Sequence, residues 1–260
     1  MTDAPSSAPS PSAPAPEPKR KPVVWIVVGI VVVLLLLVGG PFLYINVIKE
    51  DAPPPLALPG NASVSTTAST GGSPSSTTAP GAGGGDTPIS GTWTATEGSQ
   101  VGYRVEEVLL GQSTEGVGRT SEVEGSLTID GTVLTEVDLT VDMTTLTSDD
   151  PRRDGQFNGR IMDTATHPTA TFVLTEPVDI GSVPQDGDMV TITATGDLTL
   201  RGVTRSVTTD LQAQLTGGTI SVQGAIPITF ADYEIDNPSG GPAQVGDSGT
   251  LELLVVFAST

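Results

Sequence analysis

The feature that most constrains the fold of this chain is an alternation of apolar and polar residues with a period of two. Its longest example covers residues 190–200, and shorter ones cover residues 137–143, 220–230 and 251–257. Successive side chains of an extended chain point to opposite faces, so each run predicts a strand with one buried face. Pro227 in the third run indicates a sheet edge or a break in pairing, because proline cannot donate to a strand ladder.

Turn sequences rich in Gly, Asp and Pro separate these runs, as expected for antiparallel strands. One stretch departs from the alternation: residues 152–162 place Phe157 and Ile161 four positions apart, which favours a short helix. Seven to nine strands with one helical insertion predict an all-β sandwich or a closed antiparallel barrel. A parallel α/β fold is excluded because helices do not alternate with the strands.

A second apolar pattern lies near the N-terminus, where residues 23–45 carry no charge. At ~1.5 Å per residue a helix of this length crosses a hydrocarbon core of ~30 Å. The run is longer than the core of a signal peptide and no A-x-A cleavage site follows it, so we expect an uncleaved transmembrane helix. The basic run 19–21 precedes the span, which predicts a cytoplasmic N-terminus and an extracytoplasmic C-terminal part.

These patterns divide the chain into four parts. Residues 1–22 are dominated by Pro, Ser and Ala and are expected to form a disordered cytoplasmic tail, followed by the 23–45 transmembrane helix. Residues 46–88 are rich in Pro, Gly, Ser and Thr and are expected to form a disordered linker. Residues 89–260 carry all the strand patterns and are expected to form one folded domain.

Charge and composition exclude several function classes. The net charge of −19 disfavours nucleic acid as a partner, because phosphate backbones are themselves anionic. The chain has no Cys and a single His, so thiol nucleophiles, Cys-rich zinc sites and two-His metal sites are excluded. That histidine, His167, precedes Pro168, which favours an extended loop over a catalytic triad. Paired carboxylates, as used in glycoside hydrolysis, are the enzymatic alternative left open, since 25 acidic residues lie in the domain, but solvated surface charge accounts for them. We predict no catalytic residues, no metal and no cofactor.

Acidic clusters offer a weak signal for a cation site. Asp149, Asp150 and Asp154 form one cluster, and Asp186 and Asp188 form another. Neither follows the spacing of a dedicated calcium loop, and turn formation by aspartate accounts for both.

The expected interior is mainly aliphatic, with seven aromatic residues in the domain. An eight-stranded barrel holds either a solid core or one small ligand. An aliphatic lining would favour a long apolar chain over a polar metabolite. Composition leaves both alternatives open.

Motifs along the domain resemble the YceI-like family of polyisoprenoid-binding proteins over nearly all of residues 91–260. The resemblance is carried by short sequences in the family's order: WTAT at 93–96, SQVGYRV at 99–105, GSLTI at 125–129, VDLTVD at 137–142, Arg153-Asp154 followed by Phe157 and Ile161, HPTATF at 167–172, GDLTLRGVTR at 196–205 and ADYEI at 231–235.

The resemblance implies a lipocalin-like antiparallel barrel of about eight strands that binds an isoprenoid or another long-chain amphiphile without covalent chemistry. On this reading the candidate lining residues are Tyr103, Phe157, Ile161, Phe172, Leu198, Leu200, Phe230 and Tyr233. Arg153 and Asp154 are expected to fix the helical turn to the barrel mouth; the alternatives are an internal ion pair that caps the loop and contact with the ligand.

The sequence also departs from the family. Many relatives carry His-Ser in the first strand, a His at its end and another after Arg-Asp, where this chain has Gly98-Ser99, Glu107 and Gln156. Relatives are often free periplasmic proteins, whereas this chain is expected to be tethered to a bacterial cell membrane. The rival function is an extracellular interaction module whose solid barrel binds a protein or glycan through its loops.

Overall fold

The structure, a computed structural model, describes residues 27–33, 52–58, 89–240 and 243–260. The chain divides into two compact units, residues 1–50 and 51–260. In the first unit, residues 27–33 form a helix with exposed side chains. Among the described residues no helix combines the length and apolar character needed to cross a membrane. The predicted tail and most of the predicted span and linker lie outside the described residues.

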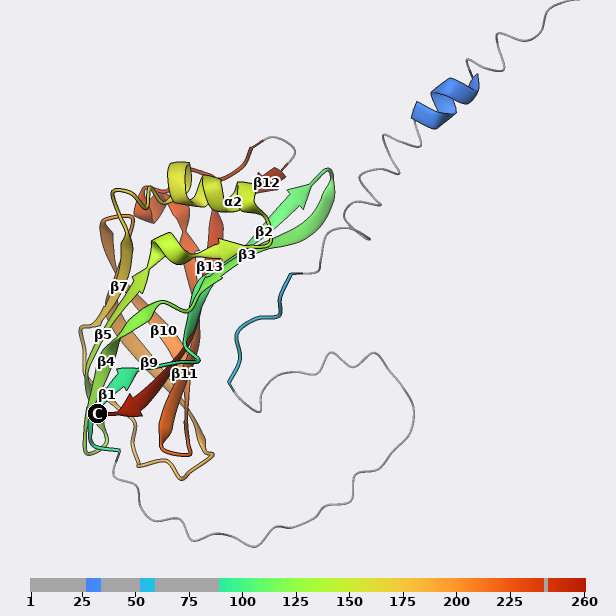
Figure 1. Cartoon of the computed structure of the whole chain (residues 1–260). Helices are drawn as coiled ribbons and strands as arrows, with labels where there is room; N and C mark the ends of the chain where they lie inside the picture. Colours follow the sequence, from blue (N-terminus) through green and yellow to red (C-terminus); the bar gives the residue numbers. More distant parts are fainter. Residues whose placement is uncertain (1–26, 34–51, 59–88, 241–242) are drawn as a thin grey trace, which may run out of the picture. The chain divides into compact units, whose positions relative to one another are not determined.

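The second unit is an all-antiparallel sheet that closes into a barrel of eight strands (Figure 1). Closure occurs between the first and last of these strands, where Trp93 pairs with Ser259. The barrel strands in spatial order are β1 (Gly91–Ala95), β4 (Val123–Asp130), β5 (Val133–Asp142), β7 (Thr169–Leu174), β9 (Met189–Leu200), β10 (Val203–Thr216), β11 (Thr219–Thr229) and β13 (Ser248–Ser259).

Further strands extend one end of the barrel. β2 (Gln100–Leu109) pairs with β13 on the edge that β1 also uses, and β3 (Gln112–Thr120) pairs with β2. Three short strands add to the sheet: β6 (Thr147–Ser148) on β3, β8 (Val178–Asp179) on β5 and β12 (Ala243–Val245) on β2.

A short helical segment covers this end of the barrel. It consists of α2 (Pro151–Gln156), which continues as the π-helix η3 (Phe157–Ile161). Figure 1 shows α2 and β12 at one end of the barrel and β1 with the C-terminus at the other. Two 3-10 turns complete the domain, η2 (Met143–Thr145) after β5 and η4 (Phe230–Tyr233) after β11.

These elements confirm the predicted fold class. The four alternating runs lie in β5, β9, β11 and β13, and the predicted helical insertion is α2 with η3. The environment of Pro227 also agrees with the prediction. The β10–β11 ladder ends at Gly224, so Pro227 pairs only with β13, opposite Thr250.

The barrel interior holds one apolar cluster built from the inward face of every barrel strand. Val255 and Phe257 of β13 are 0% and 2% exposed and lie within it. Because side chains alternate along a strand, the inward face of β13 also carries Leu251 and Leu253. Residues of β13 at the alternate positions, such as Glu252, lie on the outer face.

Candidate functional site

The middle of the barrel has an apolar inner wall that is only partly buried. Leu251 pairs with Tyr103, Leu253 with Val101, and Val255 with Val222, so these side chains share the inward face. We define the inner wall as the inward residues that pack on the core yet keep intermediate exposure: Tyr103, Val105, Leu139, Phe172, Val222, Leu251 and Leu253. Side chains that point into a closed barrel and still meet solvent face an interior space.

The barrel end formed by β1 is packed solid. Trp93 is 2% exposed, pairs with Leu127, and donates from its Nε1 to the carbonyl oxygen of Ile89 at 2.9 Å. Ile220 and Phe257 pair opposite each other and are also buried. Packed side chains therefore close the barrel at the β1 end, and α2 and η3 cover the opposite end (Figure 1).

An aromatic pair lies beneath the helical segment. The rings of Tyr103 and Phe157 stack with their centroids 5.1 Å apart and an interplanar angle of 16°. Tyr103 can lie flat on β3 because its neighbour there is Gly118, where a Cβ would stand 2.6 Å from the ring. Burial raises the pKa of the Tyr103 phenol, so this side chain is neutral near pH 7.

All eight residues that the sequence proposes as lining lie in or against the same interior cluster. Three of them, Tyr103, Ile161 and Phe172, keep partial exposure. The other five are almost sealed from solvent: Phe157, Leu198, Leu200, Phe230 and Tyr233. The structure thus brings the eight together but divides them into residues that face the interior space and residues that pack behind it.

Tyr233 has an unusual environment. It is 2% exposed, and among the described residues its hydroxyl has no hydrogen-bond partner. Burial, followed by the charge of Asp232, raises the pKa of Tyr233, so the group is a neutral phenol with an unused donor. A buried hydroxyl without a partner costs stability and is suited to meet a polar atom from outside the chain.

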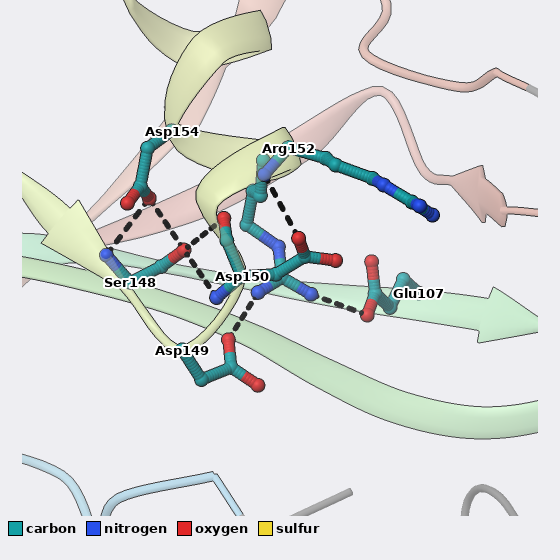
Figure 2. A network of polar contacts seen from close by, with 7 residues as sticks. Glu107, Ser148, Asp149, Asp150, Arg152 and Asp154 are labelled. Atoms are coloured by element: carbon teal, nitrogen blue, oxygen red, sulfur yellow. Dashed lines mark hydrogen bonds and ion pairs between the residues drawn. The ribbon is translucent and has the colours of Figure 1, made fainter.

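A network of charged side chains joins the helical segment to the sheet (Figure 2). Arg153 of α2 donates to Glu107 of β2 at 2.9 Å and also to Asp149. Glu107 lies on the inward parity of β2 and is 7% exposed. This pair bridges α2 to the barrel wall, so Arg153 holds the helical segment in place.

Asp154 and Asp150 serve the helical segment itself rather than Arg153. Asp154 accepts from the backbone N–H of Ser148 at 2.8 Å and from its hydroxyl at 2.6 Å. Asp150 caps the helix by accepting from the N–H of Arg152 at 2.8 Å (Figure 2). The described part of the chain contains no group of three acidic or histidine side chains arranged to hold a metal ion.

Several site features are absent from the sequence-based proposal. The alternating runs contain Val222, Leu251 and Leu253, so the sequence predicts that these side chains point inward. Their partial exposure, however, depends on how the barrel closes. The pairing of Glu107 with Arg153 joins residues 46 positions apart. The unpaired Tyr233 hydroxyl has no sequence signal, because it depends on what surrounds it.

The folded domain matches a known family model and a curated relative. Residues 93–257 match the family model described as the YceI-like domain. Protein YceI of Escherichia coli O157:H7 is 36% identical over 103 residues, which cover 38% of this chain and 49% of that protein. The match therefore spans about half the length of that relative.

Similar solved structures are more distant in sequence. A polyisoprenoid-binding domain from Saccharophagus degradans superimposes with a TM-score of 0.53 at 19% identity, covering 65% of this chain and 98% of that domain. BcnA of Burkholderia cenocepacia gives a TM-score of 0.47 at 22% identity, covering 61% of this chain and 95% of BcnA. The first of these supports the barrel fold.

Proposed function

Because the chain belongs to the YceI-like domain family, we propose that its barrel binds an isoprenoid or similar long-chain amphiphile in the interior space lined by the inner wall. The observation that carries this proposal is the partial exposure of apolar side chains that point into a closed barrel. The Saccharophagus degradans domain with this fold is a polyisoprenoid-binding domain, which supports the same ligand class here. Tyr103, Ile161 and Phe172 are the proposed apolar contacts among the eight candidates, and Tyr233, which packs behind them, is the proposed polar contact through its unpaired hydroxyl.

Binding of this kind needs little polar chemistry. Each CH₂ group that leaves water contributes about 0.8 kcal/mol, so a long apolar tail provides most of the affinity. The largely buried arginine of the covered end is already paired, since Arg153 bonds to Glu107 and Asp149. Among the described residues of the interior cluster, the buried hydroxyl of Tyr233 lacks a hydrogen-bond partner, and such a donor favours a neutral oxygen acceptor at the head of the ligand over a phosphate.

The proposal includes a membrane tether. Residues 23–45 form the proposed transmembrane anchor, with the N-terminus in the cytoplasm and the barrel outside. Because the chain has no cysteine, a Ser75→Cys variant carries a single thiol. On whole cells this thiol should react with a membrane-impermeant maleimide, and protection until the cells are lysed would contradict the proposed orientation.

The ligand proposal is tested on the full chain by native mass spectrometry after release from its membrane mimetic. We expect a bound lipid, identified by extraction, in the unmodified protein and in a Gln223→Trp variant whose new ring points outward. Val222→Trp places the same ring on the inner wall and should remove the lipid. A barrel that carries no lipid in any of the three proteins would instead support a solid interaction module.

A further inference from the structure

A segment of the predicted linker lies on the outside of the barrel. Residues 52–58 run along the face formed by β2, β3 and β13 (Figure 1). Arg104 of β2 donates to the carbonyl oxygen of Pro53 at 2.7 Å, and Arg119 of β3 donates to that of Pro54 at 2.5 Å. Both arginines have outward parity, because the neighbouring Tyr103 points inward and Arg119 pairs opposite Gly102.

The two arginines are held in place by carboxylates of the same face. Glu252 of β13 is 5% exposed and accepts from Arg104 Nε at 2.6 Å and from Arg119 at 3.0 Å. Arg104 also pairs with Glu115 at 2.5 Å. The charges of Arg104 and Arg119 are thus balanced by those of Glu115 and Glu252. The guanidinium N–H groups that do not bond to these carboxylates are suited to neutral carbonyl oxygens rather than to an anion.

A glycine lets the Arg119 side chain reach across β2. At Gly102 a Cβ would stand 2.1 Å from the carbonyl oxygen of Gly118 and 2.8 Å from Arg119 Cγ. Any larger residue there would displace the Arg119 stem from the strand. The absence of a side chain at Gly102 therefore lets the Arg119 guanidinium reach Glu252 of β13 and the carbonyl oxygen of Pro54.

The segment also buries apolar side chains on this outer face. Leu58 is 0% exposed, which places it among the most deeply buried side chains of the described residues, and Leu56 is 7% exposed. Val117 has outward parity, opposite Arg104, and is 5% exposed. None of the three belongs to the interior cluster, so their burial comes from outside it, on the part of the domain where Arg104 and Arg119 hold the preceding prolines.

The composition of the segment suits an extended, docked peptide. Three consecutive prolines at 53–55 have no backbone N–H, so docking leaves no donor unsatisfied there. Their fixed backbone angles also lower the conformational entropy lost on docking. Leu56 and Leu58 follow with period two, which directs both toward the sheet.

We propose that the outer face of β2, β3 and β13 is a docking surface for an extended proline-rich peptide, and that its occupant is this chain's own residues 52–58. We call this docked segment the clasp. It divides the predicted linker 46–88 into residues 46–51, which precede the clasp, and residues 59–88, which follow it. The attachment of the barrel to preceding residues is then made at β2 and β3 rather than at β1.

The clasp limits the reach of the barrel, a consequence that rests on the proposed anchor at 23–45. Six residues between anchor and clasp extend over at most about 20 Å at ~3.4 Å per residue. Without the clasp, the same arithmetic over the 43 residues of 46–88 gives about 150 Å. The docked segment therefore holds the domain on a short tether.

The test compares single thiols in the full chain, which lacks cysteine. Leu58→Cys places a thiol at the buried position, and Pro55→Cys places one at an exposed position of the same segment. With a charged maleimide, we expect Leu58→Cys to react at least about tenfold more slowly than Pro55→Cys, because reaction requires the clasp to open. Equal reaction rates in the otherwise unmodified chain would overturn the proposal.

A second comparison asks whether the arginines hold the clasp. Adding Arg119→Met to Leu58→Cys should restore most of the lost reactivity, since one carbonyl contact is removed. Adding Arg160→Met is the matched control, because Arg160 also donates to backbone carbonyls, those of Asn237 and Pro238, but away from the clasp. Unchanged protection in the Arg119→Met background, or equal loss in both backgrounds, would contradict the assigned role of Arg119.

Limited proteolysis of the chain without any thiol substitution provides an independent readout. Thermolysin should cut before Leu56 or Ala57 more readily in Arg119→Met than in the unmodified chain or in Arg160→Met. Neither measurement depends on a bound lipid or on the orientation of the anchor. Failure of the clasp is therefore distinguishable from failure of the proposed function.

Discussion

Replacing Tyr233 by Phe should make the ligand-free protein more stable. The side chain is 2% exposed and its hydroxyl has no partner among the described residues, so the folded protein carries a desolvated donor and acceptor. Such a group costs about 1–3 kcal/mol, and Phe keeps the ring while removing it. Allowing for local relaxation, we expect the free energy of unfolding to rise by about 1–2 kcal/mol. For a domain of this size that corresponds to an increase in Tm of roughly 2–8 °C.

The same change should weaken ligand binding. If the hydroxyl donates to the ligand head, its loss removes one hydrogen bond and raises the Kd by roughly two- to tenfold. The measurements are thermal and denaturant unfolding of the delipidated full chain, followed by titration with the lipid recovered from the native protein. Tyr103→Phe is the comparison, because the Ser148 side chain is a favourable neighbour of the Tyr103 hydroxyl and loss of this hydroxyl should not raise stability.

Two results would refute this reasoning about Tyr233. A Tyr233→Phe protein that is less stable than the original would show that the hydroxyl has a favourable partner in the ligand-free state. A variant that is more stable but binds the lipid with unchanged affinity would show that the hydroxyl is buried without contacting the ligand head.

Three further perturbations test other parts of the domain. Glu107→Ala should lower the free energy of unfolding by about 2–4 kcal/mol in denaturant melts, since its partner Arg153 keeps a poorly solvated charge. Glu106→Ala, at an exposed position, is the control and should leave the free energy of unfolding nearly unchanged. Similar losses in both variants would contradict the bridging role of Glu107. Gly196→Val should reduce the lipid recovered per protein, because a Cβ there would stand 2.4 Å from the Phe172 ring and push it into the interior space; unchanged occupancy would argue against that space. Hydrogen bonds from Thr144 lower the pKa of Asp142. The ionised Asp142 carboxylate should therefore contribute fully to the stability of the fold above the ordinary aspartate pKa of ~3.9, and this contribution should be lost as the pH falls through the lowered pKa. Asp142→Asn should accordingly be less stable than the original at about pH 6, with a gap that narrows toward about pH 2, and a gap independent of pH would refute this.

The strands of the barrel were predictable because their alternation is local. The run over residues 190–200 lies within β9, and the departure at Phe157 and Ile161 marks the helical segment. Pro227 was predicted to mark an edge or a break, and it lies beyond the end of the β10 ladder. In each case neighbouring residues contain the information, so tertiary structure was not needed to read it.

The site was predictable only in its apolar part. Phe172 and Tyr103 are inward by parity, but whether an inward residue is sealed or faces open space depends on side chains from strands far apart in sequence. Arg153 illustrates the limit, because the adjacent Asp154 bonds to Ser148 while the arginine reaches Glu107 on another strand. Sequence adjacency therefore identified the right residues but not their partners.

The clasp shows why composition alone was insufficient in the linker. Residues 52–58 share the Pro- and Ala-rich character of the rest of 46–88, which predicts an unattached tether. Leu56 and Leu58 are the local signal, two leucines of equal parity after a proline run. Their burial requires the outward Val117 and the arginines of β2 and β3, which only the folded barrel brings together.

Closure of the barrel between β1 and β13 gives the domain a seam. Trp93 pairs with Ser259, and the N–H of Thr260 donates to the carbonyl oxygen of Thr92 at 3.2 Å. The strand that enters the domain and the strand that leaves it are thus adjacent in space. A barrel with such a seam can be inserted as a module into a loop of another protein, or be circularly permuted by joining its ends and opening the Gly217–Gly218 turn, with every ladder of the barrel retained.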